Sequence, residues 1–134
     1  MSRGSVMTGK KVLVIDDEPA MHHLLKVILE GDGFELVGPE EHGEAGNSIK
    51  GKQPDLIILD IMMPEVDGFE ILEGLKRDED TKRIPVIILS VRNMEEDINK
   101  AISMGADLYL TKPFDPSGLL GAIHSVLSNS DSVN

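Results

Sequence analysis

The stretch Asp55-Leu-Ile-Ile-Leu-Asp60-Ile-Met-Met-Pro64 decides the fold of this chain. Its four consecutive large apolar residues, 56–59, run directly into Asp60. An apolar run without polar alternation is typical of a strand that is covered on both faces, as in the middle of a parallel sheet. Asp60 then stands at the carboxyl end of that strand, where open α/β sheets place ligands and chemistry. Taken alone, an aspartate in this place is more often a turn or cap residue.

Similar apolar runs recur along the chain and alternate with helical patterns. The predicted strands are 11–15, 34–37, 56–59, 85–89 and 108–110. The predicted helices are 19–31, 43–52, 67–76, 93–105 and 115–127. Five alternations of strand and helix predict an α/β fold, a doubly wound five-stranded parallel sheet with right-handed crossovers and helices on both faces.

In three of these helices, single residues indicate where the helix begins or how stable it is. Asp67 is a predicted N-cap, and Asn93 with Glu96 resembles a capping box. Gly46 and Gly51 each cost about 1 kcal/mol relative to alanine inside a helix, so we expect the helix at 43–52 to be short or frayed.

Composition limits the class of protein. The chain has 134 residues, which favours one domain, and we divide it into a leader at 1–9, a folded domain at 10–128 and a disordered polar tail at 129–134. Its net charge of -11 repels phosphate backbones and anionic lipids, so we expect no direct contact with nucleic acid or membrane. With no cysteine, no signal-peptide pattern and no long apolar span, we expect a cytoplasmic protein.

Polar residues follow four of the predicted strands. Asp16 and Asp17 follow the first, Asp60 the third, Ser90 the fourth and Lys112 the fifth. A doubly wound sheet brings these positions to one crevice. Two like charges about 4 Å apart repel by about 4 kcal/mol at an effective dielectric near 20, so this acidic cluster calls for a cation. Carboxylate oxygens without histidine or cysteine favour Mg²⁺.

This combination suits transfer of a phosphoryl group to a carboxylate. Asp60 attacks phosphorus in line, while the metal ion and Lys112 neutralise the charge that builds up on the phosphoryl oxygens. Each residue also has a plainer interpretation: the acids before Pro19 as helix caps, Ser90 as a turn residue, Lys112 as a solvated charge. Their joint occurrence at successive strand ends is what argues for a site.

Several of these motifs together resemble the receiver domain of bacterial two-component response regulators, of the chemotaxis-regulator type. They are Val-Leu-Val-Ile-Asp16-Asp17-Glu18-Pro19, Ile-Leu-Asp60-Ile-Met-Met-Pro64, Ser90 and Tyr109-Leu-Thr-Lys112-Pro113-Phe114. The resemblance covers about 10–127 and implies a flavodoxin-like sheet of order 2-1-3-4-5. It implies a phosphorylation-activated signalling receiver that is not an enzyme and catalyses only its own phosphorylation and dephosphorylation.

The resemblance also implies roles for the site residues. Asp60 is the expected phosphoacceptor. The expected Mg²⁺ ligands are Asp17, Asp60 and the carbonyl of Met62, with Asp16 acting through water. Lys112 is expected to hold the phosphoryl group and to precede a cis proline.

A switch surface follows from the same resemblance. Ser90 closes onto the phosphoryl group, Tyr109 swings inward, and the surface formed by the fourth helix, fifth strand and fifth helix, roughly 94–127, changes. The implied partners are a sensor histidine kinase or a histidine phosphotransfer protein, and a homodimer through that surface. Three family positions hold residues that affect the phosphoryl lifetime: Val91, Met62 and Arg92.

Two other functions compete with this interpretation. A phosphohydrolase of the haloacid-dehalogenase type needs a second acid two residues after the nucleophile, where this chain has Met62. A scaffold that is never phosphorylated is disfavoured by the intact Asp17, Asp60 and Lys112. The four histidines, at 22, 23, 42 and 124, lack metal-site spacing and are interpreted as surface residues.

Overall fold

The computed structural model describes residues 9–38 and 53–132, and in these ranges five strands form one parallel sheet. The strands are β1 (Lys11–Ile15), β2 (Glu35–Val37), β3 (Leu56–Leu59), β6 (Val86–Ser90) and β7 (Leu108–Thr111). Their order in the sheet is β2-β1-β3-β6-β7. Counted along the chain, this is the predicted order 2-1-3-4-5, which is confirmed.

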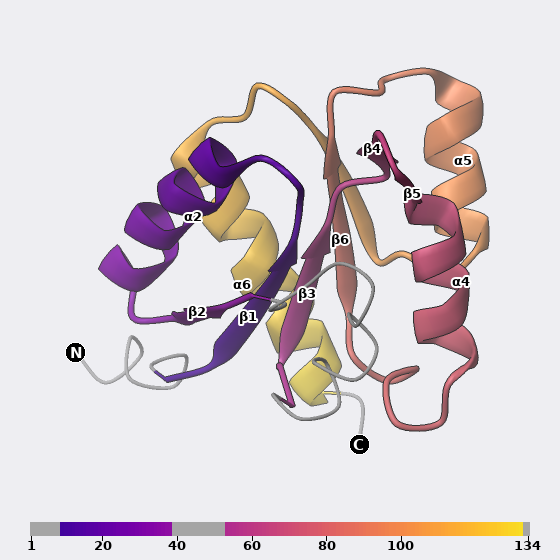
Figure 1. Ribbon diagram of the computed structural model, residues 1–134. Coiled ribbons are helices and arrows are strands. Elements are labelled where there is room, and N and C mark those ends of the chain that lie inside the picture. The colour runs from indigo at the N-terminus through magenta and orange to yellow at the C-terminus, as the bar shows by residue number, and fades with distance from the viewer. Residues whose placement is uncertain (1–8, 39–52, 133–134) are drawn as a thin grey trace.

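Helices cover both faces of the sheet, as the alternation of elements predicted (Figure 1). They are α2 (Pro19–Gly31), α4 (Gly68–Arg77), α5 (Glu95–Ser103) and α6 (Pro116–Ser132). Figure 1 shows α2 and α6 on one side of the sheet and α4 and α5 on the other. Among the described residues, no helix combines the length and apolar character needed to cross a membrane.

The central strand β3 divides the core into two clusters. Leu56 and Ile58 pack with α2 and α6, while Ile57 and Leu59 pack with α4 and α5. All four side chains are buried, because successive residues of a strand point to opposite faces and both faces are covered. The predicted two-sided strand is therefore confirmed.

Two predicted boundaries are wrong. Helix α5 has Met94 as its N-cap and no side-chain cap bond, so Asn93 and Glu96 form no capping box. The carbonyl of Met94 accepts the backbone N–H groups of Asp97 and Ile98, which places the N-cap one residue after the predicted Asn93. Helix α6 continues to Ser132, into the tail predicted to be disordered, since no glycine or proline after Gly121 interrupts its hydrogen bonding.

A small hairpin follows β3 that the sequence did not predict. Its strands are β4 (Met62–Met63) and β5 (Val66–Asp67), which pair antiparallel. It joins the end of β3 to α4, whose predicted N-cap is confirmed, because Asp67 accepts the N–H of Phe69 at 2.9 Å. The predicted helix at 43–52, His42 and residues 1–8 of the predicted leader lie outside the described residues.

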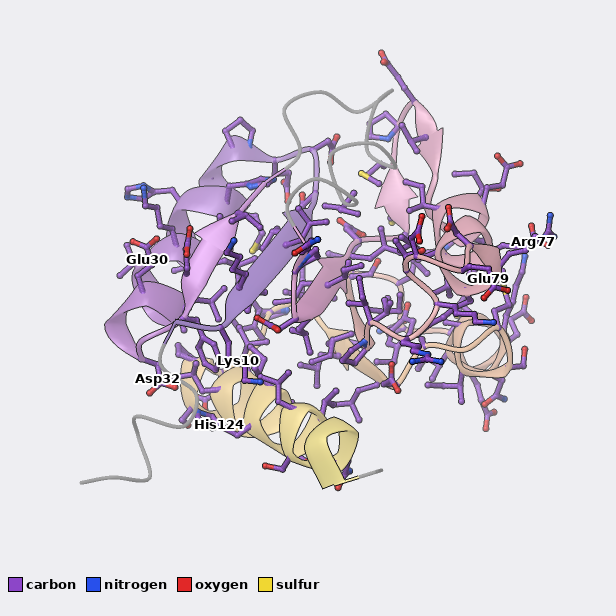
Figure 2. The ribbon with its side chains drawn as sticks, turned by 90° about the horizontal axis from the view of Figure 1, so that it is seen from below. Lys10, Glu30, Asp32, Arg77, Glu79 and His124 are labelled. Atoms are coloured by element: carbon purple, nitrogen blue, oxygen red, sulfur yellow. The ribbon has the colours of Figure 1, made fainter. Side chains whose placement is uncertain are left out.

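The side of the molecule away from the strand carboxyl ends is seen in Figure 2. There His124 of α6 lies beside Asp32, with 2.7 Å between Nε2 and the carboxylate oxygen. The His124 ring also meets the Phe34 ring edge-on at a centroid distance of 5.5 Å. These contacts join α6 to the chain that follows α2.

Candidate functional site

The strand pairing brings the predicted site residues to one edge of the sheet. Ile15 of β1 pairs with Leu59 of β3, so Asp16 and Asp60 are the next residues of neighbouring strands. Ser90 ends β6, and its carbonyl accepts the backbone N–H of Lys112 at 2.8 Å. The strands run upward in Figure 1, and this acidic edge is at the top.

Lys112 connects the two buried aspartates. Its Nζ lies 3.0 Å from Oδ2 of Asp16 and 3.1 Å from Oδ2 of Asp60. The side chains are 8, 4 and 6% exposed for Lys112, Asp16 and Asp60 respectively. Glu18, which was not among the predicted site residues, adds a more distant carboxylate, 3.5 Å from the Lys112 Nζ. The peptide bond between Lys112 and Pro113 is cis, as the resemblance implied.

Burial and neighbouring charges shift the pKa values of Asp16 and Lys112. Desolvation raises the pKa of Asp16, although the N–H of Glu18 and the ammonium of Lys112 oppose the shift. For Lys112, desolvation alone lowers the pKa, but the hydrogen bonds and charges of Asp16 and Asp60 outweigh it and the pKa is raised. Lys112 is therefore held in its charged form between the two carboxylates.

Three aspartate carboxylates form a cluster at this edge of the sheet. One oxygen each of Asp16, Asp17 and Asp60 lie within 4.8 Å of one another. A single lysine cannot neutralise three acids, and repulsion between them favours a bound cation. Oxygen-only ligands fit a hard divalent ion such as Mg²⁺. The backbone N–H of Met62 donates to Oδ1 of Asp60 at 2.8 Å, which fixes the carboxylate toward the cluster.

Ser90 and Tyr109 both contact Arg92, the second residue after β6. Ser90 is fully buried, and its Oγ accepts the N–H of Arg92 at 3.2 Å. The hydroxyl of Tyr109 donates to the carbonyl of Arg92 at 2.8 Å. The tyrosine ring packs against the core cluster on the α4 and α5 side. The two predicted switch residues thus meet at one loop.

Sequence reasoning missed two residues that shape the site. A Cβ on Gly68 would lie 2.2 Å from Cα of Ile61, so only glycine lets α4 approach the backbone that follows Asp60. Nε2 of His22 lies 2.6 Å from the carbonyl oxygen of Asp16, and His22 is half-buried rather than a free surface residue. The pair Asp67-Gly68 was the available signal for the first; a lone histidine gave none for the second.

Residues 12–124 match the family model of the response regulator receiver domain. The chain belongs to this family. Receiver domains act in two-component systems, where histidine kinases phosphorylate them on an aspartate. The resemblance to receiver domains and the implied function, a signalling receiver that a histidine kinase phosphorylates, are therefore confirmed.

Relatives of this receiver domain include transcriptional regulators. The phosphate regulon transcriptional regulatory protein PhoB of Pseudomonas aeruginosa is 40% identical over 121 residues, which are 90% of this chain and 53% of that protein. The DNA-binding dual master transcriptional regulator RpaA of Synechocystis is 39% identical over 129 residues, covering 92% of this chain and 51% of the relative. The chain thus spans about half the length of these relatives.

Among solved structures, a CheY-like response regulator receiver domain protein from Methanospirillum hungatei has the same fold. The two superpose with a TM-score of 0.85 and are 28% identical in sequence. The alignment covers 95% of this chain and 100% of the other.

Two expectations need correction. We classed the chain as not an enzyme, and this is wrong as stated, since receiver domains are signalling modules with a weak autophosphatase activity. We also expected no direct contact with nucleic acid from the net charge of -11. That expectation is not confirmed, because RpaA, a relative of this receiver domain, is a DNA-binding regulator.

Proposed function

We propose that Asp60 is the aspartate that accepts the phosphoryl group. The observation that carries this assignment is its position between two hydrogen-bond donors, the Met62 N–H at 2.8 Å and the Lys112 ammonium at 3.1 Å. Both donors orient the carboxylate, and Asp16 and Asp17 stand beside it. Asp16 is held in the same way, by the N–H of Glu18 and by Lys112, but of the two aspartates only Asp60 follows the central strand β3.

The reaction is a transfer between two protein side chains. An oxygen of Asp60 attacks phosphorus of a phosphohistidine, the P–N bond breaks, and the imidazole leaves after taking up a proton. Lys112 stays in place and exchanges the Asp60 carboxylate for a phosphoryl oxygen, so charge that develops in the transition state meets a cation that is already positioned. The buried, nearly closed surroundings of Lys112 strengthen this interaction.

Asp17, Asp60 and the carbonyl of Met62 are the proposed Mg²⁺ ligands, and Asp16 acts through water. The fit rests on the excess of carboxylate over ammonium groups at this edge. When bound, the ion supplies positive charge to the phosphoryl oxygens. The protein's own contribution is to hold the carboxylates together and to keep Lys112 charged.

The surface that responds is formed by α5, β7 and α6. Ser90 donates its hydroxyl hydrogen to a phosphoryl oxygen, and Tyr109 follows the Arg92 loop inward. Exposed apolar side chains of this loop and of α5 support a protein-binding role: Val91 is 54% exposed, Met94 61% and Ile102 45%. The proposed partners are a histidine kinase or phosphotransfer protein and a second copy of the chain. The cytoplasmic location remains a prediction.

The test is the intact mass of three proteins after incubation with acetyl phosphate and Mg²⁺: the wild type, Asp60→Asn and Asp55→Asn. Asp55 stands at the other end of β3 and accepts the N–H of Lys11 at 2.8 Å, a bond that asparagine can keep. We expect one phosphoryl group on the wild type and on Asp55→Asn, and none on Asp60→Asn or without Mg²⁺. Modification of Asp60→Asn would overturn the assignment.

An unmodified wild type leaves two explanations that a second probe separates. Beryllofluoride stands in for the phosphoryl group on an aspartate and does not depend on the rate of hydrolysis. A beryllofluoride complex would show an adduct too short-lived to collect, whereas its absence would favour the scaffold interpretation. Size-exclusion chromatography of the same complex tests the homodimer.

A further inference from the structure

Arg92 joins three elements around the site. Its N–H donates to Oγ of Ser90 at 3.2 Å, and its carbonyl accepts the hydroxyl of Tyr109 at 2.8 Å. Its side chain pairs with Asp97, with 3.4 Å between Nε and Oδ2. The end of β6, the only tyrosine of the chain and the first turn of α5 are therefore linked through one residue.

The ion pair is partly shielded from solvent. The Asp97 side chain is 16% exposed and that of Arg92 42%. By contrast, the pair of Arg77 with Glu73 has side chains that are 75 and 54% exposed. Because solvent screens exposed pairs most, we expect the Arg92 pair to be stronger than the Arg77 pair and similar to the pair of Lys76 with Asp107, whose side chains are 18 and 41% exposed. Its neighbours Glu95 and Glu96 are exposed.

The charges of this loop and of the acceptor site all act on Tyr109. Desolvation raises the pKa of Tyr109, and the charges of Asp97, Arg92 and Asp60 all contribute to that pKa, Arg92 lowering it and the two aspartates raising it. The register agrees with this proximity, since Leu59 pairs with Ile88 and Ser90 therefore lies one residue beyond the neighbour of Asp60. The charges of Arg92, Asp97 and Asp60 therefore all reach the Tyr109 hydroxyl.

A phosphoryl group on Asp60 changes this balance. It carries up to about two negative charges and three acceptor oxygens, whereas Asp97 offers one charge and two oxygens. A guanidinium binds phosphate oxygens in the same forked geometry as a carboxylate. The Arg92 side chain therefore has two alternative anions, one on α5 and one at the acceptor site.

We propose that Asp97 is a positioning residue that competes with the phosphoryl group on Asp60 for the guanidinium of Arg92. The proposal rests on the proposed role of Asp60. Before phosphorylation, Asp97 keeps the guanidinium on α5 and the loop at 91–94 in its present place. After phosphorylation, the guanidinium exchanges partners, the loop closes with Ser90 and Tyr109, and the first turn of α5 loses its link to the loop. Asp97 thereby sets the threshold of the switch.

The test is the affinity for beryllofluoride in the presence of Mg²⁺, read from the fluorescence of Tyr109 in a chain without tryptophan. Asp97→Asn removes the competing charge and keeps the shape of the side chain. Exposed or partly exposed pairs are worth about 0.2–1 kcal/mol, so we expect affinity to rise by about 1.5- to 5-fold. Asp97→Glu, which restores the carboxylate, returns the affinity toward that of the wild type.

Two matched variants separate competition from a general effect of charge. Glu96→Gln removes one acid from the same helical turn, and we expect it to leave the affinity unchanged. Arg92→Gln removes the contested group, so adding Asp97→Asn to it has no further effect, a non-additivity that a double-mutant cycle measures. Thermal unfolding of each variant verifies that it is folded.

The outcomes distinguish this proposal from the one on which it rests. A wild type that binds no beryllofluoride overturns the role of Asp60, and the competition with it. A wild type that binds, together with an Asp97→Asn that binds equally well, overturns the competition alone. Additive effects in the double variant, or the same gain from Glu96→Gln, also overturn it.

Discussion

The same residue types lie at the carboxyl ends of the strands, the acidic edge, and at their amino ends, the basal edge. Their roles at the two edges differ. At the acidic edge, Lys112 lies 3.0 and 3.1 Å from Asp16 and Asp60, and Asp17 brings a third carboxylate. At the basal edge, where the strands begin, Lys76 donates to the carbonyl of Ile84 at 2.9 Å and pairs with Asp107 at 3.7 Å. Both edges thus carry a lysine beside an aspartate.

The difference lies in what each carboxylate has to do. Asp107 accepts the N–H of Val86 at 2.8 Å, and Asp55 accepts that of Lys11 at 2.8 Å, so the basal aspartates satisfy the first donor of a strand. At the acidic edge, the three carboxylates of Asp16, Asp17 and Asp60 outnumber the one ammonium group, that of Lys112, which contacts the cluster. A carboxylate that is fully paired and hydrogen-bonded stabilises the fold. A carboxylate without a counter-charge remains available to bind a cation or to react.

By cavity volume alone, the basal edge would be chosen as the functional site. A pocket of about 680 Å³ lies at the basal edge, against Lys76, Lys82 and Arg83. The pocket beside Asp17, Met63 and Val66 has only about 240 Å³. A phosphoryl group needs little space but many precisely placed charges, so the residues and not the volume identify this site.

The largest expected effect compares the two lysines. Replacing Lys112 with methionine removes a cation from the transferring group, and we expect the rate of phosphorylation by acetyl phosphate to fall by at least about 100-fold. Lys76→Met leaves that rate unchanged, because Lys76 contacts only basal groups. Time courses of intact mass give both rates. An equal loss in the two variants would contradict the division between the edges.

Magnesium should stabilise the protein through the acidic edge alone. At about 100 times its dissociation constant, a ligand of the native state adds about 2.7 kcal/mol to the free energy of unfolding. We expect this gain in the wild type and in Asp55→Asn, and its loss in Asp17→Asn, measured by urea unfolding with and without Mg²⁺. A gain that survives in Asp17→Asn would place the ion elsewhere.

The basal carboxylate should matter for stability only. Asp107→Ala leaves the N–H of Val86 without its partner and Lys76 without its counter-charge, at a cost of about 1 kcal/mol given that the carboxylate is 41% exposed. Asp107→Asn keeps an acceptor oxygen and costs less. Urea unfolding measures both, and a slower phosphorylation of either variant would argue against a purely structural role.

The smallest expected effect is a difference between Lys112 and Lys76 in how each changes the stability of the fold at alkaline pH. The pKa of Lys112 is raised above 10.5, so its contribution to stability is complete below that pH and is lost as pH rises through the folded-state value. Desolvation lowers the pKa of Lys76 below 10.5 despite Asp107, so the cost of its charged form falls as pH rises toward 10.5.

Unfolding of Lys112→Met and Lys76→Met between about pH 9 and pH 11 tests these signs. As pH rises above 10.5, the free energy of unfolding should fall less in Lys112→Met than in the wild type. As pH rises toward 10.5, Lys76→Met should lack the gain in free energy of unfolding that Lys76 gives the wild type. Parallel curves for the two variants would show that the lysines are equivalent.

The sequence predicted the framework well because local patterns carry it. The run 56–59 predicted a strand buried on both faces, and Pro19 and Asp67 marked helix starts that the structure has at the expected places. The N-cap of α5 was misplaced by one residue, since the first turn of this helix is closed by the carbonyl of Met94 and by no side chain. The hairpin β4–β5 was missed because two-residue strands carry no periodicity.

By itself the sequence determined the order of strands and helices, and which residues follow the strand ends, because apolar periodicity and the position of polar residues are local properties of the chain. Only the tertiary structure decided which atoms meet. The contacts of Lys112 with Asp16, of His22 with the Asp16 carbonyl and of Gly68 with Ile61 join residues whose distance depends on strand pairing and helix packing. Burial then fixed their electrostatics, since desolvation acts only after the chain has closed around the charges.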